Sequence, residues 1–205
     1  MYLMQMDIPH PTKAKLIETT SELLKEFKSG DITAEMVLTK SNISKGSLYH
    51  HFDDLEELIE TALLVRYAKW VDRSVSVMTP LLLNAKSPED IYAGLVEVTR
   101  QTQHPDLKKE RFFRVEVLTK ANSSSRFAER LRELQQHLTD SLEDIIREAQ
   151  ERGFFTKSLD PKAIAVFIQA YSLGKVLDDL SDSPVNPENY TELINTIIRE
   201  VFIAK

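Results

Sequence analysis

A helical period of apolar residues runs from one end of this chain to the other. Apolar side chains recur every three or four residues, the alternation expected of strands is hard to find, and only five of the 205 residues are glycine. Residues at this spacing fall on one face of an α-helix. The sequence therefore predicts an all-α protein of about nine helices, without internal repeats.

Local start and stop signals divide this pattern into helices. Three starts combine a capping side chain with a proline in the first turn, at Ser87-Pro88, Asp160-Pro161 and Asn186-Pro187. The predicted helices cover about residues 12–28, 33–41, 45–51, 54–78, 88–103, 106–120, 125–151, 160–181 and 187–203. The early helices are short and the later ones long. We therefore expect an N-terminal arm and small domain over residues 1–53 and a larger helical domain over residues 54–205.

The composition argues against several classes of protein. The chain has no cysteine, which excludes a disulfide framework and a thiolate nucleophile and fits a reducing cytoplasm. Its longest apolar run, residues 163–168, is far shorter than the roughly 20 residues of a membrane span. The first eleven residues predict a flexible arm and not a secretory signal. No phosphate-binding glycine loop, serine elbow or HExxH motif occurs, so we expect neither an enzyme nor a cofactor.

The stretch SKGSLYHHF, residues 44–52, is the most distinctive part of the sequence. With Ser44 as the N-cap, Leu48 and Phe52 fall on one face of a short helix and polar side chains fall on the other. Adjacent histidines on a helix diverge by about 100°, so His50 and His51 do not share a metal ion, and we expect no metal site. Two interpretations remain: a solvated surface helix, or the second helix of a DNA-binding unit.

Residues 33–41, a break at residues 42–44 and this second helix have the size of a helix-turn-helix. We expect its core to contain Leu23, Leu24, Phe27, Val37, Leu38, Ile43, Leu48 and Phe52. The exposed side chains are donors suited to phosphates and base edges: Lys45, Ser47, Tyr49, His50 and His51. Gly46 leaves the backbone open to close approach, and Thr33 offers a phosphate both a hydroxyl and a helix N-terminus.

Charge does not favour this interpretation. The net charge of the chain is −6, and residues 1–55 contain six lysines and eight acidic residues. Any binding of a polyanion must therefore depend on where the basic groups lie.

The sequence ISKGSLYHHF, which follows TAEMVLTKSN, resembles the DNA-binding signature of the tetracycline-repressor (TetR) family of bacterial transcription regulators. Residues 149–180 resemble the family's last long helices more loosely. The resemblance implies an all-helical homodimer that binds palindromic double-stranded DNA and is usually a repressor released by a small-molecule effector. It implies operator contacts through Ser44, Lys45, Gly46, Ser47, Tyr49, His50 and His51.

The sequence departs from the family at two places. Leu55 stands where the family usually has a lysine that can meet a phosphate, so we expect weaker or more salt-sensitive binding. Ser41 and Asn42 stand where the inter-helix turn often has a small residue and then glycine, and asparagine tolerates the left-handed backbone needed there. The alternative function is a helical sensor or interaction protein with weakened DNA binding.

The two C-terminal helices carry more apolar surface than one core needs. Helix 160–181 has apolar residues on two sides, and helix 187–203 has one long stripe. Either helix 160–181 is the central helix of a monomer, or both helices form a symmetric four-helix interface. We favour the dimer, with an interface of Ile164, Phe167, Ile168, Tyr171, Gly174, Lys175, Ile194, Ile197, Ile198 and Val201.

Apolar and aromatic residues of the middle helices also have two interpretations, as plain core or as the lining of an effector pocket. They are Trp70, Met78, Val96, Phe112, Phe113, Val117, Leu138 and Leu142. The family resemblance favours the pocket, with Arg100, Gln103, His104 and Arg114 as polar candidates. The sequence does not indicate which effector binds. Binding there would tilt helix 54–78 and shift the population of DNA-competent molecules.

Overall fold

The computed structural model describes residues 10–204 of the chain. Within that range the α-helices are α1 (Pro11–Leu23), α2 (Ala34–Ser41), α3 (Lys45–His51), α4 (Leu55–Asn84), α5 (Pro88–Thr102), α6 (Lys108–Lys120), α7 (Ser125–Glu151), α8 (Pro161–Gly174), α9 (Val176–Asp179) and α10 (Pro187–Ile197). Short 3-10 helices lie at Ser29–Asp31 and Pro105–Leu107, and one π-helical turn at Ile198–Phe202. The described residues form no strand, so the predicted all-α fold is confirmed. The predicted N-terminal arm lies outside the described range, apart from His10 and Pro11.

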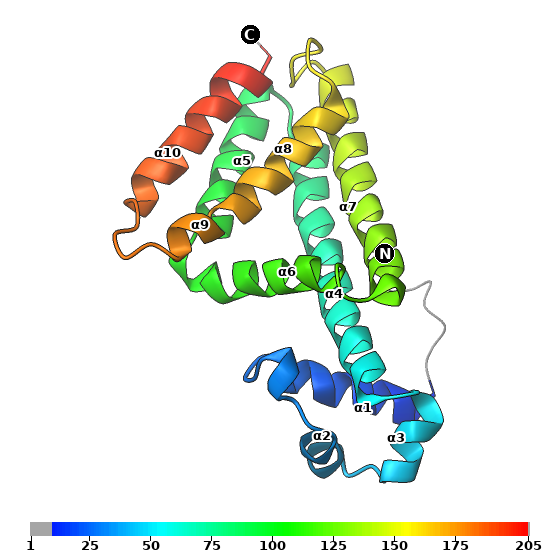
Figure 1. The fold of residues 1–205 in the computed structure, drawn as a ribbon. Helices are drawn as coiled ribbons and strands as arrows, with labels where there is room; N and C mark the ends of the chain where they lie inside the picture. Colours follow the sequence, from blue (N-terminus) through cyan, green and yellow to red (C-terminus); the bar gives the residue numbers. More distant parts are fainter. Residues whose placement is uncertain (1–9, 205) are drawn as a thin grey trace.

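The helices gather in two groups joined by α4 (Figure 1). Helices α1, α2 and α3 lie together at one end of α4, and we call residues 10–53 the head. Helix α4 runs from the head into the second group, where it packs along α7. Helix α6 crosses between the groups, and α8, α9 and α10 lie away from the head (Figure 1).

Helix α4 begins as its sequence predicts and ends later. The carboxylate of Asp54 accepts a hydrogen bond from the backbone N–H of Glu57, and the Glu57 side chain accepts one from Asp53, both at 2.7 Å. This is a variant of the predicted capping box, in which Glu57 bonds to the residue before the N-cap. The predicted end near Met78 is wrong, because α4 continues through Pro80 to Asn84.

The late end of α4 depends on a distant contact. Arg152, which follows α7, donates to the carbonyl oxygens of Leu82 and Ala85, each at 2.5 Å. These carbonyls belong to the last turn of α4 and the residue after it, where a helix lacks partners of its own. Packing and the Arg152 side chain therefore stabilise the end of α4, although this segment contains Pro80.

Two other predicted helices are interrupted in the structure. Helix α1 ends at Leu23, and Phe27 is 43% exposed, so its predicted place in the core is wrong. The chain leaves the helix in a series of turns that rotate Phe27 outward. The predicted helix 160–181 breaks at Lys175, whose ammonium group pairs with Asp178 inside the protein.

Helix α7 has the predicted bounds. Its C-terminus is closed by Gly153, which has a φ of +75°, a value that glycine adopts readily. The N–H of Phe154 bonds to the carbonyl of Ala149 at 2.8 Å, and the N–H of Gly153 bonds to that of Gln150 at 3.1 Å. This pair of bonds is a Schellman motif, and it turns the buried Phe154 back onto the core.

Candidate nucleic-acid interface

Helices α2 and α3 form a helix-turn-helix with the predicted local chemistry. The hydroxyl of Thr33 caps α2 by accepting the N–H of Met36 at 3.3 Å. Asn42 closes α2 in the left-handed region, with φ 53° and ψ 40°, as expected for the turn without glycine. Ser44 then caps α3 by accepting the N–H of Ser47 at 3.2 Å. Side-chain capping at both starts positions the two helices independently of packing.

Helix α3 has one buried face and one exposed polar face. Leu48 is fully buried and Phe52 nearly so. Lys45, Tyr49 and His50 are exposed, with 45% of Tyr49 accessible. These three side chains are free to reach a groove or a phosphate, as the sequence predicts for an outward face.

The glycine and the two serines at the start of α3 differ in what they offer a ligand. A Cβ added at Gly46 would meet nothing within 4 Å, so packing does not require glycine there. The hydroxyls of Ser44 and Ser47 lie 2.9 Å apart and hydrogen-bond to each other. Gly46 thus leaves open space at the surface, whereas the two serines are partly engaged in capping.

His51 faces α1 and lies at the margin of the polar face. Its ring centroid lies 5.0 Å from that of His10, the N-cap of α1, and 5.1 Å from that of His50. Partial burial lowers the pKa of His51, and the charges of His10, His50 and Lys13 lower it further. His51 is therefore more readily neutral than an isolated histidine.

Sequence reasoning missed two side chains near α3. His10 reaches His51, and the ammonium group of Lys13 lies 5.2 Å from the ring centroid of Phe52. Both come from the start of α1 and meet α3 only because the helices pack together. No local pattern around residues 10–13 indicates this contact.

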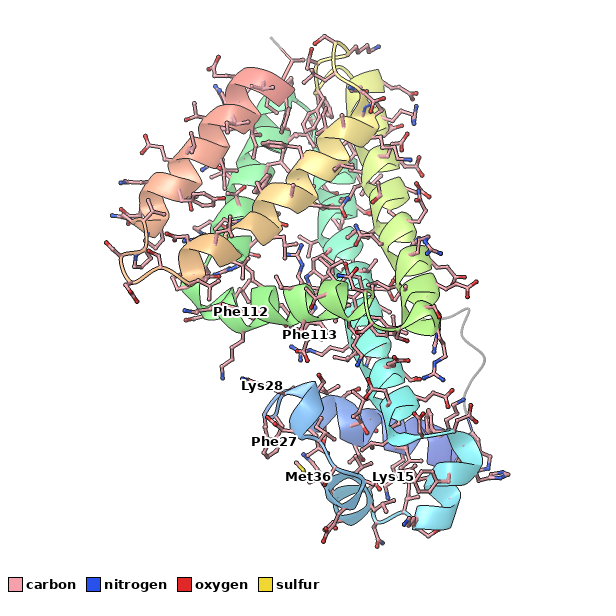
Figure 2. The ribbon with its side chains drawn as sticks, viewed as in Figure 1. Lys15, Phe27, Lys28, Met36, Phe112 and Phe113 are labelled. Carbon is pink, nitrogen blue, oxygen red and sulfur yellow. The ribbon has the colours of Figure 1, made fainter. Side chains whose placement is uncertain are left out.

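Basic residues are spread over the head. Lys15, Lys28, Lys40 and Lys45 are exposed, and Lys40 lies 3.4 Å from Glu22. Figure 2 labels Lys15, Phe27, Lys28 and Met36 on the head, across from Phe112 and Phe113 on α6. Thr33 lies beside a groove of about 410 Å³ that Phe27 and Met36 also line.

The residues predicted for an effector pocket are spread over a small cavity, an open groove and the core. Met78 lines a cavity of about 20 Å³, too small for an effector. Arg100 lines an open groove of about 710 Å³ between α5 and α10, and it pairs with Glu97 at 2.6 Å. Gln103 and His104 line the same groove.

The other predicted pocket residues belong to the core or its edge. Val117, Leu138 and Leu142 are buried in the core, so the plain-core interpretation applies to them. Phe113 is buried beneath the guanidinium of Arg66, and the half-buried Phe112 lies 5.9 Å from the Lys108 ammonium group. Val96 is half-buried on α5, and Trp70 lies against Arg114.

Burial corrects the predicted dimer interface. Ile164, Lys175, Ile194 and Ile198 are buried within a single protomer, so their placement at an interface is wrong. Packing of α8 against α7 turns Ile164 inward. Phe167 and Val201 are exposed, while four predicted residues are half-buried: Ile168, Tyr171, Gly174 and Ile197.

The last helices carry other exposed apolar side chains in addition to Phe167 and Val201. We define the C-terminal apolar face as Val166, Phe167, Leu177, Leu180, Leu193 and Val201, all on or next to α8, α9 and α10. The sequence pattern had shown the second stripe of helix 160–181, but not which stripe faces solvent. The stripe of α8 that faces solvent is the one that does not pack against α7.

No helix within residues 10–204 is both long and apolar enough to cross a membrane. Over the same residues, no group of three or more histidine, aspartate or glutamate side chains is arranged to hold a metal ion.

Neither a protein-family model nor a curated protein matches the chain. Solved structures do match. A TetR-family transcriptional regulator from Mesorhizobium loti, described as putative, superposes with a TM-score of 0.71 at 17% identity, over 92% of this chain and 93% of that one. GusR of Salmonella enterica gives 0.67 at 21% identity, over 95% and 96%. A transcriptional regulator from Saccharomonospora viridis, solved with choline, gives 0.71 at 16% identity, over 94% and 98%. At these identities the likeness concerns the fold.

Proposed function

We propose that this chain, whose fold is that of the TetR-family transcription regulators, is a dimeric DNA-binding regulator. The observation that carries the proposal is the exposed polar face of α3, with Lys45, Tyr49 and His50 outward and Leu48 buried behind them. Hydroxyl, imidazole and ammonium donors on a short helix are suited to base edges and phosphates of a major groove. The open space at Gly46 permits the DNA backbone to approach the helix.

The C-terminal apolar face supports the dimer. Its six large side chains are exposed on or next to α8, α9 and α10, and these helices lie away from the head (Figure 1). Exposed apolar side chains that form one contiguous patch usually mark a protein–protein contact. A two-fold axis through it leaves both heads free to contact DNA half-sites about 34 Å apart.

An effector that alters the position of α6 or α4 would change the separation of the two α3 helices. Helix α4 is continuous from the head into the second group of helices, so a change in its tilt would move the head directly. Such an effector shifts the balance between two states, and DNA must in turn weaken effector binding. By this proposal the regulator is a repressor that the effector releases.

The test is a salt-dependent DNA-binding assay on a site selected from random sequence by the purified protein. We expect a palindromic site and an affinity that falls steeply as salt rises. Tyr49→Ala should weaken binding roughly 10- to 100-fold, because a base-edge or phosphate contact contributes about 1–3 kcal/mol. Lys157→Ala, an exposed change far from α3, is the control and should bind like the wild type.

Selection that yields no consensus site would contradict the proposal. The second candidate, a sensor with weakened DNA binding, is favoured by Leu55 at the start of α4 and by the acidic Asp53 and Asp54 beside α3. It predicts a stable dimer and weak binding without sequence preference. The selection and the salt slope therefore separate the two functions.

A further inference from the structure

Two arginines one turn apart on α6 are buried, and they differ in their partners. Arg111 is 2% exposed and donates to both carboxylate oxygens of Asp179, at 2.5 and 2.9 Å. It also donates to the backbone carbonyls of Thr102 and His104, at 3.1 and 3.2 Å. The buried charge of Arg111 is thus paired with a carboxylate, and its guanidinium also donates to two backbone carbonyls.

Arg114 has no comparable support. It is 8% exposed, its Nη2 lies 3.4 Å from the hydroxyl of Ser172, and its Nε has no hydrogen-bond partner among the described residues. Burial lowers the pKa of this guanidinium, although arginine stays protonated in proteins. The ring of Trp70 lies 4.2 Å from the guanidinium carbon, but an aromatic face replaces few of the lost hydrogen bonds.

The surrounding charges leave one positive charge without a partner. Arg66, Arg111 and Arg114 are the three guanidinium groups of this region. Glu110 pairs with Arg66 and Asp179 pairs with Arg111. No carboxylate within residues 10–204 forms an ion pair with Arg114. Arg114 is therefore the one guanidinium of these three without a carboxylate partner of its own, although the charge of Glu110 also acts on it. A ligand with a single negative charge would supply that partner.

Neutral hydrogen-bonding groups continue from Trp70 across α7 and α8. The ring of Tyr67 lies 5.3 Å from that of Trp70, and its hydroxyl donates to Gln135 at 2.7 Å. Gln135 in turn donates to Gln169 at 2.5 Å. Burial raises the pKa of Tyr67 to about 12, so this hydroxyl remains a neutral donor.

A second buried side chain near the end of α5 also lacks partners. Gln103 is 1% exposed, and neither its amide oxygen nor its amide nitrogen has a partner within the described residues. Gln103 follows Thr102, whose backbone carbonyl accepts a hydrogen bond from Arg111. Gln103 also lines the groove between α5 and α10, so it does not belong to the surroundings of Arg114. Unpaired buried polar groups are rare in folded proteins, so the Nε of Arg114 points to a site that is completed by a ligand.

We propose that Arg114 anchors a site for a small monocarboxylate with an apolar body, held between α4, α6 and α8. A carboxylate accepts two parallel hydrogen bonds from one edge of a guanidinium, and its single charge matches the unpaired one. A doubly charged phosphate would keep an uncompensated charge in a buried place. The apolar body contacts Trp70 and the core beside it. The proposal deepens the proposed function by naming its effector class, and only the consequence for DNA rests on that function.

Trp70 and Ser172 are half-buried, so Arg114 lies one side chain below the surface. The ligand reaches the guanidinium by displacing the Trp70 ring from its face. Since Trp70 is the only tryptophan of the chain, its fluorescence reports this displacement without a label. The test is a titration of the full-length protein with cyclohexanecarboxylate at constant ionic strength. We expect a saturable change in Trp70 emission, and none with cyclohexanecarboxamide or cyclohexylmethylamine.

Matched variants locate the site. Arg114→Met should weaken cyclohexanecarboxylate binding roughly 10- to 100-fold, the range for hydrogen bonds to a charged group. Arg132→Met makes the same change at an exposed position of α7 and should bind like the wild type. Arg114→Lys keeps the charge but not the planar pair of donors, so its binding should be intermediate.

Thermal unfolding separates a ligand site from a structural role. Removal of an unpaired buried charge should leave the unfolding temperature of Arg114→Met unchanged or higher. A lower unfolding temperature would mean that the guanidinium stabilises the ligand-free protein, and the inference would be wrong. It would also be overturned by a flat titration, or by equal binding of the carboxylate and the carboxamide.

DNA binding is measured separately on the selected site, so the two proposals fail independently. If the protein binds DNA but not cyclohexanecarboxylate, the proposed ligand site is wrong and the proposed function stands. If the protein binds the carboxylate through Arg114 but selects no DNA sequence, the proposed function is wrong and the proposed ligand site stands.

Discussion

The carboxylate of Glu110 on α6 lies 3.2 Å from the guanidinium of Arg66 on α4. The same guanidinium donates to the backbone carbonyl of Leu24, just past the end of α1, at 3.2 Å, and it lies 3.6 Å from the ring centroid of Phe113. One side chain therefore connects the head, α4 and α6. Figure 2 shows Phe113 on α6, which lies along the side of the second group that faces the head. A displacement of α6 changes the environment of Arg66 and reaches the head through Leu24.

Arg66→Met should lower the free energy of unfolding by about 1–2 kcal/mol, because it leaves the half-buried Glu110 and the Leu24 carbonyl without their donor. Denaturant titrations of Arg66→Met, Glu110→Gln and the double variant measure the coupling. We expect the double variant to lose less than the sum of the single losses. Additive losses would show that the pair is not coupled.

Gly46→Ala should have opposite effects on stability and on DNA binding. An added Cβ meets open space, and alanine is favoured over glycine inside a helix by about 0.5–1 kcal/mol. The free protein should therefore become more stable. The methyl group occupies the space that we assign to the DNA backbone, so affinity for the selected site should fall. Melting curves and DNA titrations of one preparation test both parts, and unchanged affinity would contradict the close approach.

Val166→Glu should convert the dimer to monomers, because it places a charge in the C-terminal apolar face. Val166 is 51% exposed in one protomer, so the change should not disturb the fold itself. Leu83→Glu is the control, since Leu83 is a 69% exposed apolar residue at the far end of α4. Light scattering at micromolar concentration gives the mass of each. A dimeric Val166→Glu protein would place the interface elsewhere.

The lowered pKa of His51 predicts a pH dependence of stability. The unfolded chain takes up a proton near pH 6.5, while the folded state resists it. Above this pH, His51 is neutral in both states and costs no stability. As the pH falls from the pKa of His51 in the unfolded chain to its lower pKa in the folded protein, the free energy of unfolding decreases. Urea midpoints of the wild type should drop between pH 7.5 and pH 5.5 by more than those of His51→Gln. Parallel curves would show that burial and the neighbouring charges do not lower the pKa of His51 in the folded protein.

Much of the fold follows from short stretches of sequence. The helical period, the capping box of Asp54 and Glu57 and the glycine that ends α7 each act within a few residues, and the structure has all of them. The outward face of α3 was predictable for the same reason, since Leu48 and Phe52 mark the opposite side. Their spacing alone indicates which side chains face solvent.

The errors arose where distant segments meet. The break at Lys175, the exposure of Phe27 and the continuation of α4 past Pro80 have no strong local signal. Each depends on contacts between elements, such as the bonds from Arg152 to the end of α4. The buried stripe of α8 was likewise chosen by packing on α7, which the period of α8 does not encode.

The sequence by itself determined the helices, their caps and the polar face of α3, because backbone hydrogen bonding and side-chain spacing act over one or two turns. Only the tertiary structure decided which charges are paired. Arg111 meets Asp179 from 68 positions away, whereas Arg114, three residues later on the same helix, meets no carboxylate among the described residues. The physical reason is that the energy of a buried charge depends on the partners that folding brings within hydrogen-bond distance.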